Sequence, residues 1–223
     1  MQASYFCVRN TRLKNKSKCV TELMAKIAPE PLDPTLVIQA YAQGVFPMAD
    51  QWGRLRWYAP DPRAILEHDN LHVSHSLRAT LNKGIYEIRM DTDFEGVMRC
   101  CAERNDGDST WINEEFIKTY TFLHRAGMAH SVETWLDDKL VGGLYGVTIG
   151  AAFMGESMFS RATDASKVAL VALVEHLKKR RYVLHDTQFL TSHLATLGVT
   201  EIPRSMYEKR LKEALRMRCA WSE

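Results

Sequence analysis

The chain has 223 residues, of which 46% are hydrophobic and 25% are charged, and its formal net charge is +2. This balance is typical of a folded globular protein with one full-sized domain and room for a small second one, and it excludes an intrinsically disordered chain. No apolar run of roughly eighteen residues occurs, and no apolar segment follows the basic N-terminus, so we expect neither a membrane span nor a secretory signal.

The cysteines and histidines do not form a recognisable set of metal ligands. The five cysteines are odd in number and lack the spacing of a disulfide framework, which favours a reducing, cytoplasmic location. Cys100 and Cys101 are adjacent in a predicted helix and therefore point in different directions. His72 and His75 have a spacing that metal sites sometimes use, but no second pair of ligands accompanies them. We predict no metal site.

The first predicted elements belong to a small N-terminal lobe. Six of the seven prolines lie within the first 62 residues, and this change in composition predicts a small domain at residues 1–62 and a larger one at residues 63–223. Asp33 and Pro34 predict the cap and the first turn of a helix that ends at Gly44. The segments VFPM and WYAPDPR, which follow this helix, are predicted to form turns.

The larger domain shows the apolar periods of both strands and helices. Asp137 and Asp138 separate two strand patterns and predict an antiparallel hairpin. Ser205 and Glu208 predict a capping box at the start of the last helix. The order of the elements predicts an α+β fold with a mixed, largely antiparallel sheet flanked by helices. The predicted strands are 85–91, 130–136, 139–150, 151–155 and 182–186, and the predicted helices before the last one are 93–104, 113–124, 165–181 and 191–198.

Positive charge gathers in four segments of the chain. Residues 1–18 contain no acid, and residues 178–181 end the longest predicted helix with four consecutive cations. The last helix is also basic, and Arg78 and Lys83 form a weaker fourth group. Solvated helix ends explain these groups, because cations are favoured near helix C-termini, and an RNA partner is the alternative explanation. Charge alone favours the solvated ends.

Four polar or aromatic residues fall where the pattern predicts the ends of strands or the start of a helix. Glu156 follows the strand AAFMG, Asp186 and Gln188 lie in the segment HDTQF, and Trp111 precedes a helix. Strand ends commonly frame ligand clefts, so these residues are candidates for a site. Two structural alternatives stay open: a surface ion pair of Glu156 with Arg161, and a role for Asp186 as the N-cap of the next helix.

Several common catalytic motifs are missing from the sequence. No nucleophile elbow, phosphate-binding loop or dinucleotide-binding glycine motif occurs. The element order resembles that of N-acetyltransferases, but the pyrophosphate-cradling loop of that superfamily, Q/R-x-x-G-x-G/A, is absent after AAFMG. Acyl-coenzyme A is therefore not expected as a donor.

Eight sequence blocks occur in an order and at a spacing that resemble the bacterial leucyl/phenylalanyl-tRNA–protein transferases. The similarity runs from about residue 33 to about residue 210, and the first thirty or so residues lie outside it. The blocks are YAQGVFPM, WYAPDPRAIL, STWI, HSVETWLDDKLVGGLYGV, FMGESMFSRATDASKVAL, DTQF, LATLG and EIPRSMY.

The resemblance implies transfer of leucine or phenylalanine from charged tRNA to the N-terminal amine of proteins that begin with arginine or lysine, which marks them for N-end-rule degradation. Leu-tRNA and Phe-tRNA are then co-substrates, and no metal, ATP or acyl-coenzyme A is expected, because the ester on tRNA is already activated. The family's fold is a small N-terminal domain followed by an acetyltransferase-like (GNAT-type) domain. A cytoplasmic monomer without membrane association is expected.

The resemblance also implies roles for individual residues. Gln188 is expected to contact the attacking amine and Asp186 to polarise Gln188, while Glu156 is expected beside the cationic acceptor. Trp111 matches the aromatic residue that stacks on the terminal adenosine of tRNA, and Met48 stands where a second such ring, a tryptophan, is often found. The expected pocket for the aminoacyl side chain comprises Leu144, Phe153, Gly155, Leu170 and Leu173. The expected contacts of the tRNA phosphates are Arg78, Lys83, Lys178, Lys179, Arg180 and Arg181.

The chain departs from the family pattern at His185 as well, where an aliphatic residue is common. An imidazole there narrows the expected pocket or makes it more polar. Two other functions stay open at this point. One is another tRNA-dependent aminoacyl- or acyltransferase of the same superfamily, and the other is a non-catalytic RNA-binding module that uses the basic clusters.

Overall fold

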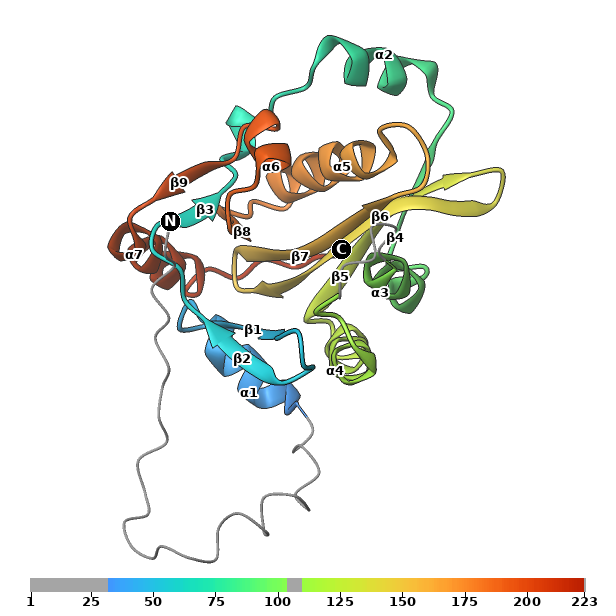
Figure 1. Ribbon diagram of the computed structural model, residues 1–223. Coiled ribbons are helices and arrows are strands. Elements are labelled where there is room, and N and C mark those ends of the chain that lie inside the picture. The colour runs from blue at the N-terminus through green and yellow to red at the C-terminus, as the bar shows by residue number, and fades with distance from the viewer. Residues whose placement is uncertain (1–31, 104–109, 223) are drawn as a thin grey trace, which may run out of the picture.

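The N-terminal lobe consists of one helix and a two-stranded sheet. The computed structural model describes residues 32–103 and 110–222 (Figure 1). Helix α1 (Pro34–Tyr41) starts after Asp33, whose carboxylate accepts a hydrogen bond from the backbone N–H of Thr35 at 2.8 Å, as predicted. Strands β1 (Phe46–Ala49) and β2 (Leu55–Tyr58) pair antiparallel.

The prediction of turns for VFPM and WYAPDPR was therefore wrong. Residues 46–49 and 55–58 are strands, and Arg63 begins a further one, so that within these two segments only residues 59–62 form the predicted turn. Proline weakens a strand pattern because it has no N–H to donate, but it is tolerated on an edge strand, and both strands of a two-stranded sheet are edges. The aromatic residues of these segments favour the extended conformation.

The large domain contains one seven-stranded mixed sheet, which confirms the predicted α+β class. The strand order is β4-β5-β6-β7-β8-β3-β9, and only the pair β7–β8 is parallel. The hairpin at Asp137 and Asp138 is confirmed. The strands are β3 (Arg63–Ile65), β4 (Glu87–Met90), β5 (Ala129–Leu136), β6 (Lys139–Ile149), β7 (Ala152–Ser160), β8 (Leu184–Gln188) and β9 (Thr200–Ile202).

The predicted helices are present, but the last one is not capped as expected. Helix α7 starts after Pro203 without a side-chain cap, and Ser205 lies inside its first turn. The Glu208 carboxylate instead accepts a hydrogen bond from Nε of Arg204 at 2.7 Å. The capping-box prediction was therefore wrong. The helices of the large domain are α2 (His75–Lys83), α3 (Phe94–Ala102), α4 (Glu114–Arg125), α5 (Ala165–Lys179), α6 (Ser192–Thr196) and α7 (Arg204–Ala214).

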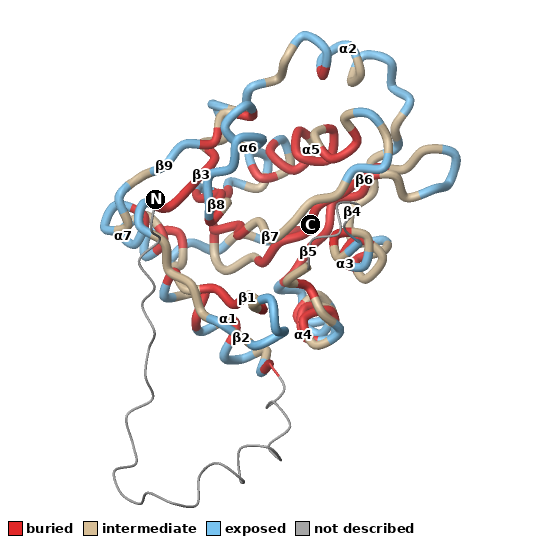
Figure 2. The backbone as a smooth tube through the Cα atoms, viewed as in Figure 1, coloured by how far each residue is buried: buried red, intermediate tan, exposed pale blue. Residues whose placement is uncertain are grey.

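Helices cover both faces of the sheet. Helix α5 lies across one face, whereas α1, α3 and α4 lie on the other (Figure 1). The inward sides of α5 and of the central strands are buried (Figure 2). Leu170 and Leu173 of α5 are 3% and 1% exposed, and each buried leucine stabilises the fold by roughly 1.5–3 kcal/mol.

The lobe and the large domain share a hydrophobic core. Val37, Tyr41 and Phe46 of the lobe belong to the same buried cluster as Tyr120 and Tyr145 of the large domain. The division into domains at residues 1–62 and 63–223 stays a prediction. Among the described residues, no helix has both the length and the apolar character needed to cross a bilayer.

Candidate active site where two strands part

Glu156 lies at an irregularity inside β7. Tyr145 of β6 pairs with Ser157, and the next residue, Gly146, pairs with Gly155, so that Glu156 has no partner of its own in β6. An extra residue of this kind is a β-bulge, which changes the direction of a side chain and recurs next to active sites. The prediction that Glu156 follows the end of a strand was wrong, because β7 continues to Ser160.

Strand β8 has the same kind of irregularity opposite β3. Ala64 and Ile65 are adjacent, but their partners, Gln188 and Asp186, are separated by one residue. The backbone of Gln188 has a φ of +66°, in the left-handed region that residues other than glycine seldom adopt. Such conformations are found where surrounding contacts hold them in place, often at functional sites.

The two irregular segments face one another where β7 and β8 part. The parallel pairing of these strands ends at Met154 and Asp186. Beyond that point, Nε2 of Gln188 donates a hydrogen bond to Oε1 of Glu156 at 2.9 Å. The structure thus brings together the Glu156 and Gln188 side chains, as expected from the sequence.

Two tyrosines complete the surroundings of the Glu156 carboxylate. The hydroxyl of Tyr41 donates to Oε1 at 2.6 Å, and the hydroxyl of Tyr120 lies 2.7 Å from that of Tyr41 and 3.5 Å from Oε2. The alternative ion pair with Arg161 was wrong, because Arg161 pairs with Glu103 on the surface.

The ionisation of Glu156 is strongly perturbed. Desolvation by burial, with a further contribution from the negative charge of Asp186, raises the pKa of Glu156 to about 8. Burial next to this carboxylate also raises the pKa of Tyr41 and of Tyr120 above the usual range. The Glu156 carboxyl is therefore mostly protonated at pH 7, and a cation placed beside it would favour its ionised form.

Asp186 is fully buried, and both of its oxygens are occupied. Oδ1 accepts hydrogen bonds from Nε of Arg63 and from the backbone N–H of Gln188, both at 2.8 Å. Oδ2 accepts from Nη2 of Arg63 at 2.6 Å and from the hydroxyl of Tyr207 at 2.8 Å. The alternative role of Asp186 as a helix cap was wrong, because the side chain of Thr191 caps α6. Asp186 thus contacts the backbone of Gln188, not its side-chain amide.

Comparison with known proteins identifies the family. The model of the leucyl/phenylalanyl-tRNA protein transferases matches residues 65–212, and the model of their N-terminal domain matches residues 30–61. The chain is 54% identical over 187 residues to the leucyl/phenylalanyl-tRNA–protein transferase of Rubrobacter xylanophilus, covering 83% of this chain and 96% of that protein. It is 55% identical over 185 residues to that of Herpetosiphon aurantiacus, covering 82% of this chain and 95% of that protein.

The chain belongs to the leucyl/phenylalanyl-tRNA protein transferase family.

A solved structure, that of L-PGS from Bacillus licheniformis, resembles this family member only weakly. The TM-score is 0.41 at 12% identity, with 60% of this chain and 48% of that chain covered. A score this low does not assign a shared fold, and the GNAT-type fold stays a prediction.

The apolar residues expected to bind the aminoacyl side chain in this family lie on the other face of the sheet from Tyr41 and Tyr120. They form one buried cluster between the sheet and α5. Those that belong to strands point to this face because neighbouring side chains of a strand alternate between the two faces. Gly155 precedes Glu156, and a β-carbon there would point towards Phe153 and His185, at 3.8 and 3.7 Å. The residues of this buried cluster are Leu144, Phe153, Leu170 and Leu173.

His185 lies against this apolar cluster. Its ring is perpendicular to that of Phe153 at a centroid distance of 5.4 Å, and its Nδ1 has no hydrogen-bond partner among the described residues. Burial lowers the pKa of His185 to about 3, so the ring is neutral at pH 7. The departure from the family pattern at this position therefore adds a polar but uncharged group.

The residues expected to stack on adenosine lie on the same face as the tyrosines. Trp111 contacts Phe116 edge to face at 5.4 Å, and Met48 belongs to β1. Both are partly buried and pack against the core that contains Tyr120.

The residues expected to contact tRNA phosphates divide into two groups at opposite ends of α5. Arg78 and Lys83 are exposed on α2, whose Leu77 packs against Val168 and Val171 in the first half of α5. The second group begins in the last turn of α5, where Lys178 pairs with Asp69. The remaining members of that group are Lys179, Arg180 and Arg181. The basic residues 1–18 lie outside the described part of the chain.

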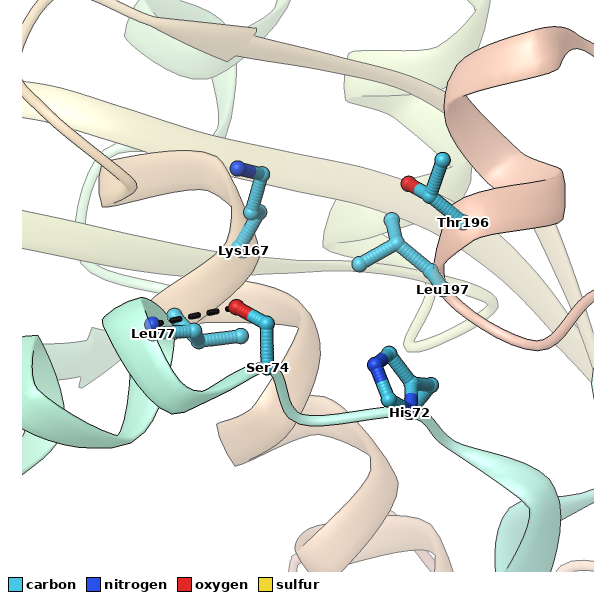
Figure 3. Close-up of a pocket in the computed structure, with 6 residues that line it drawn as sticks. All are labelled: His72, Ser74, Leu77, Lys167, Thr196 and Leu197. Atoms are coloured by element: carbon cyan, nitrogen blue, oxygen red, sulfur yellow. Dashed lines mark hydrogen bonds between the residues drawn. The ribbon is translucent and has the colours of Figure 1, made fainter.

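Two further features are separate from the Glu156 site. A small cavity of about 150 Å³ lies among α2, α5 and α6 and contains none of the predicted site residues (Figure 3).

Asp91, His124 and His130 come close enough together to bind a metal ion. However, Nδ1 of His130 is hydrogen-bonded to Asp91 at 2.8 Å, and Nδ1 of His124 to the carbonyl of Ala129 at 2.9 Å.

Sequence reasoning missed four residues that contact the central carboxylates. They come from α1, β3, α4 and α7, and their contacts depend on how these elements fold together. Three of them, Tyr41, Arg63 and Tyr207, are present in the blocks that carry the family resemblance, which was the available signal. The four residues are Tyr41, Arg63, Tyr120 and Tyr207.

Two glycines near the bulge should respond oppositely to a methyl group. A β-carbon at Gly146 would lie 2.4 Å from the carbonyl oxygen of Met154 and from a ring carbon of Phe153, whereas one at Gly155 would meet nothing closer than 3.5 Å. We expect Gly146→Ala to lower the free energy of unfolding by about 1–3 kcal/mol, and Gly155→Ala to change it little. Thermal unfolding of both variants checks this, and equal midpoints would contradict it.

Proposed function

We propose that this chain transfers leucine or phenylalanine from charged tRNA to the N-terminal amine of proteins that begin with arginine or lysine. The family membership supports the reaction type. The observation that carries the assignment to this site is the hydrogen bond between Gln188 and Glu156 across the parted strands, next to an Asp186 whose oxygens are already occupied.

The reaction forms a peptide bond and breaks an ester bond. The neutral amine of the acceptor attacks the carbonyl carbon of the aminoacyl ester, and the ribose oxygen of the terminal adenosine leaves with a proton. The neutral amine loses one of its two protons as the amide forms, and this loss balances the proton that the ribose oxygen takes up. Because the ester is already activated, we propose that no ATP, metal or acyl-coenzyme A takes part. Correct placement of amine and ester can itself supply roughly 7–11 kcal/mol of the barrier in the best cases.

Glu156 is the group that receives the proton of the amine. An α-amine has a pKa of about 7.7–8.0, close to the value of about 8 at Glu156, so that a proton moves between them at little cost. The same carboxylate, once ionised, attracts a cationic acceptor. Gln188 holds Oε1 of Glu156 through its N–H, and the carbonyl of its amide is the acceptor atom for the amine.

Asp186 orients Gln188 and does not take a proton. Its oxygens accept four hydrogen bonds, two of them from the guanidinium of Arg63. A carboxylate whose oxygens already accept this many hydrogen bonds offers no lone pair for a substrate proton.

The two ends of the donor are proposed to lie on different sides of the parted strands. The adenosine lies near Trp111, and the leucine or phenylalanine side chain reaches past Gly155 towards Phe153 and His185. The absence of a side chain at Gly155 and the end of the β7–β8 pairing support this path. The acetyltransferase-like fold of the large domain is proposed on the same family resemblance.

Transfer of labelled leucine from Leu-tRNA to short peptides tests the function. Peptides that begin with Arg or Lys should be labelled, and those that begin with Asp or Ala should not. Labelling of none of the four would contradict the proposal. Transfer to a different class of acceptor would favour the related tRNA-dependent acyltransferase, and tRNA binding without transfer would favour the RNA-binding module.

A further inference from the structure

Arg63 is a buried arginine at the point where the chain leaves the lobe and enters the large sheet. It is 1% exposed and is the first residue of β3. Its guanidinium lies between the rings of Phe46 and Tyr207, 4.7 and 4.6 Å from their centroids. A buried ion pair contributes little net stability compared with apolar residues of the same volume, so the presence of this one calls for another explanation.

On one side, the Arg63 guanidinium is connected to Gln188 through Asp186. Nε and Nη2 bind the two oxygens of Asp186 at 2.8 and 2.6 Å, and Oδ1 of Asp186 accepts the backbone N–H of Gln188 at 2.8 Å. Gln188 has an unfavourable left-handed backbone, which these bonds help to hold. The Gln188 side chain then donates to Glu156 at 2.9 Å.

On its other side, the guanidinium contacts the lobe. Nη1 of Arg63 donates to the carbonyl oxygen of Gly44 at 3.1 Å. Gly44 follows the end of α1, the helix that carries Tyr41, and the hydroxyl of Tyr41 donates to the Glu156 carboxylate at 2.6 Å. Arg63 is therefore connected to Glu156 by two series of contacts, one through Asp186 and Gln188 of the sheet and one through Gly44 and Tyr41 of the lobe.

We propose that Arg63 is a positioning residue of the transfer reaction, which holds Gln188 and Tyr41 on either side of the Glu156 carboxylate through Asp186 and Gly44. This inference rests on the proposed function. Tyr207 supports the arrangement, because its ring packs on the guanidinium and its hydroxyl donates to Asp186.

Two conservative substitutions test the inference. Arg63→Lys keeps the positive charge, but an ammonium group cannot reproduce the two parallel bonds to Asp186 together with the bond to Gly44. We expect kcat for transfer to fall by about 10- to 100-fold, because a small misplacement of catalytic groups has effects of that order. Tyr207→Phe keeps the ring and removes the hydrogen bonds of the hydroxyl to Asp186 and from Nη2 of Arg63, at 2.8 and 3.4 Å, and it should lower kcat by less. The KM values for Leu-tRNA and for the acceptor peptide should stay near those of the wild type.

Arg210→Lys is the matched control. Arg210 also lies on α7, one turn after Tyr207, and pairs with Glu67 just beyond β3, at 2.9 Å between Nη2 and Oε2. The Arg210–Glu67 pair joins α7 to the segment after β3, much as Tyr207 joins α7 to Arg63 of β3. It does not contact Asp186, so the control should keep the wild-type kcat. Melting temperatures of all three variants are measured first, and activity is assayed well below the lowest of them.

The results separate this inference from the function on which it rests. If the wild type transfers leucine and Arg63→Lys keeps its kcat, or loses only affinity for a substrate, Arg63 is not a positioning residue. A fall in kcat with Arg210→Lys equal to that with Arg63→Lys overturns the inference as well. If Arg63→Lys does not fold, an unchanged kcat in Tyr207→Phe decides against it. A wild type that transfers nothing overturns the proposed function itself.

Discussion

Glu156→Gln should slow transfer by about 10²- to 10⁴-fold, the usual range for the loss of a group that accepts a proton in the reaction. Glutamine keeps the size of the side chain and can still bond to Tyr41 and Gln188, but it cannot take a proton. The measurement is kcat/KM for transfer of labelled leucine from Leu-tRNA to a peptide that begins with Arg.

The pH dependence of the same assay provides a second expected result. Glu156 has a pKa raised to about 8, so its ionised form increases as the pH rises through that value, and the wild-type rate should rise with it. The acceptor amine must also lose a proton, with a pKa of about 7.7–8.0. Well below pH 7, the logarithm of kcat/KM should therefore rise with a slope of about two in the wild type and about one in Glu156→Gln.

Glu103→Gln is the control for this prediction. Glu103 is an exposed acid that pairs with Arg161, away from the Glu156 carboxylate. The control should keep both the rate and the slope of the wild type. A slope of two that persists in Glu156→Gln would show that another group of the protein accepts the proton.

Asp186→Ala should lower the free energy of unfolding by about 3–5 kcal/mol, because it leaves the guanidinium of Arg63 buried without its partner. Arg63 and Asp186 are 1% and 0% exposed in their side chains, so water cannot replace the lost carboxylate. Unfolding by urea, followed at neutral pH, measures the change. Asp69→Ala is the control, because the pair of Asp69 with Lys178 is exposed and such pairs contribute little.

A double variant separates the structural part of this effect from the catalytic part. Arg63→Met with Asp186→Leu replaces the pair by apolar side chains, and it should recover part of the stability lost in Asp186→Ala. It should not recover transfer, because Gln188 loses the bond that holds its backbone. A single variant Asp186→Ala as stable as the wild type would contradict the ion-pair explanation.

The predicted elements and the three central residues came from local patterns in the sequence. The period of the apolar residues located α5 and the hairpin of β5 and β6, because that pattern depends only on neighbours in the chain. Glu156, Asp186 and Gln188 stood out because polar side chains next to apolar strands are unusual, and the family blocks implied their roles. The β1–β2 hairpin was missed because Pro47 obscured the strand pattern.

The tertiary structure alone decided which contacts those three residues make. The bulges at Glu156 and before Gln188 arise from the register of β7 against β6 and of β8 against β3, and a register belongs to two strands, not to one segment. The ion pair of Arg63 with Asp186 joins residues 123 positions apart in the chain. Folding also placed Phe153 on the opposite face from Tyr41, because side chains alternate along a strand and each face packs against different helices. The sequence by itself thus determined which side chains are available, whereas contacts between distant segments decided which of them meet.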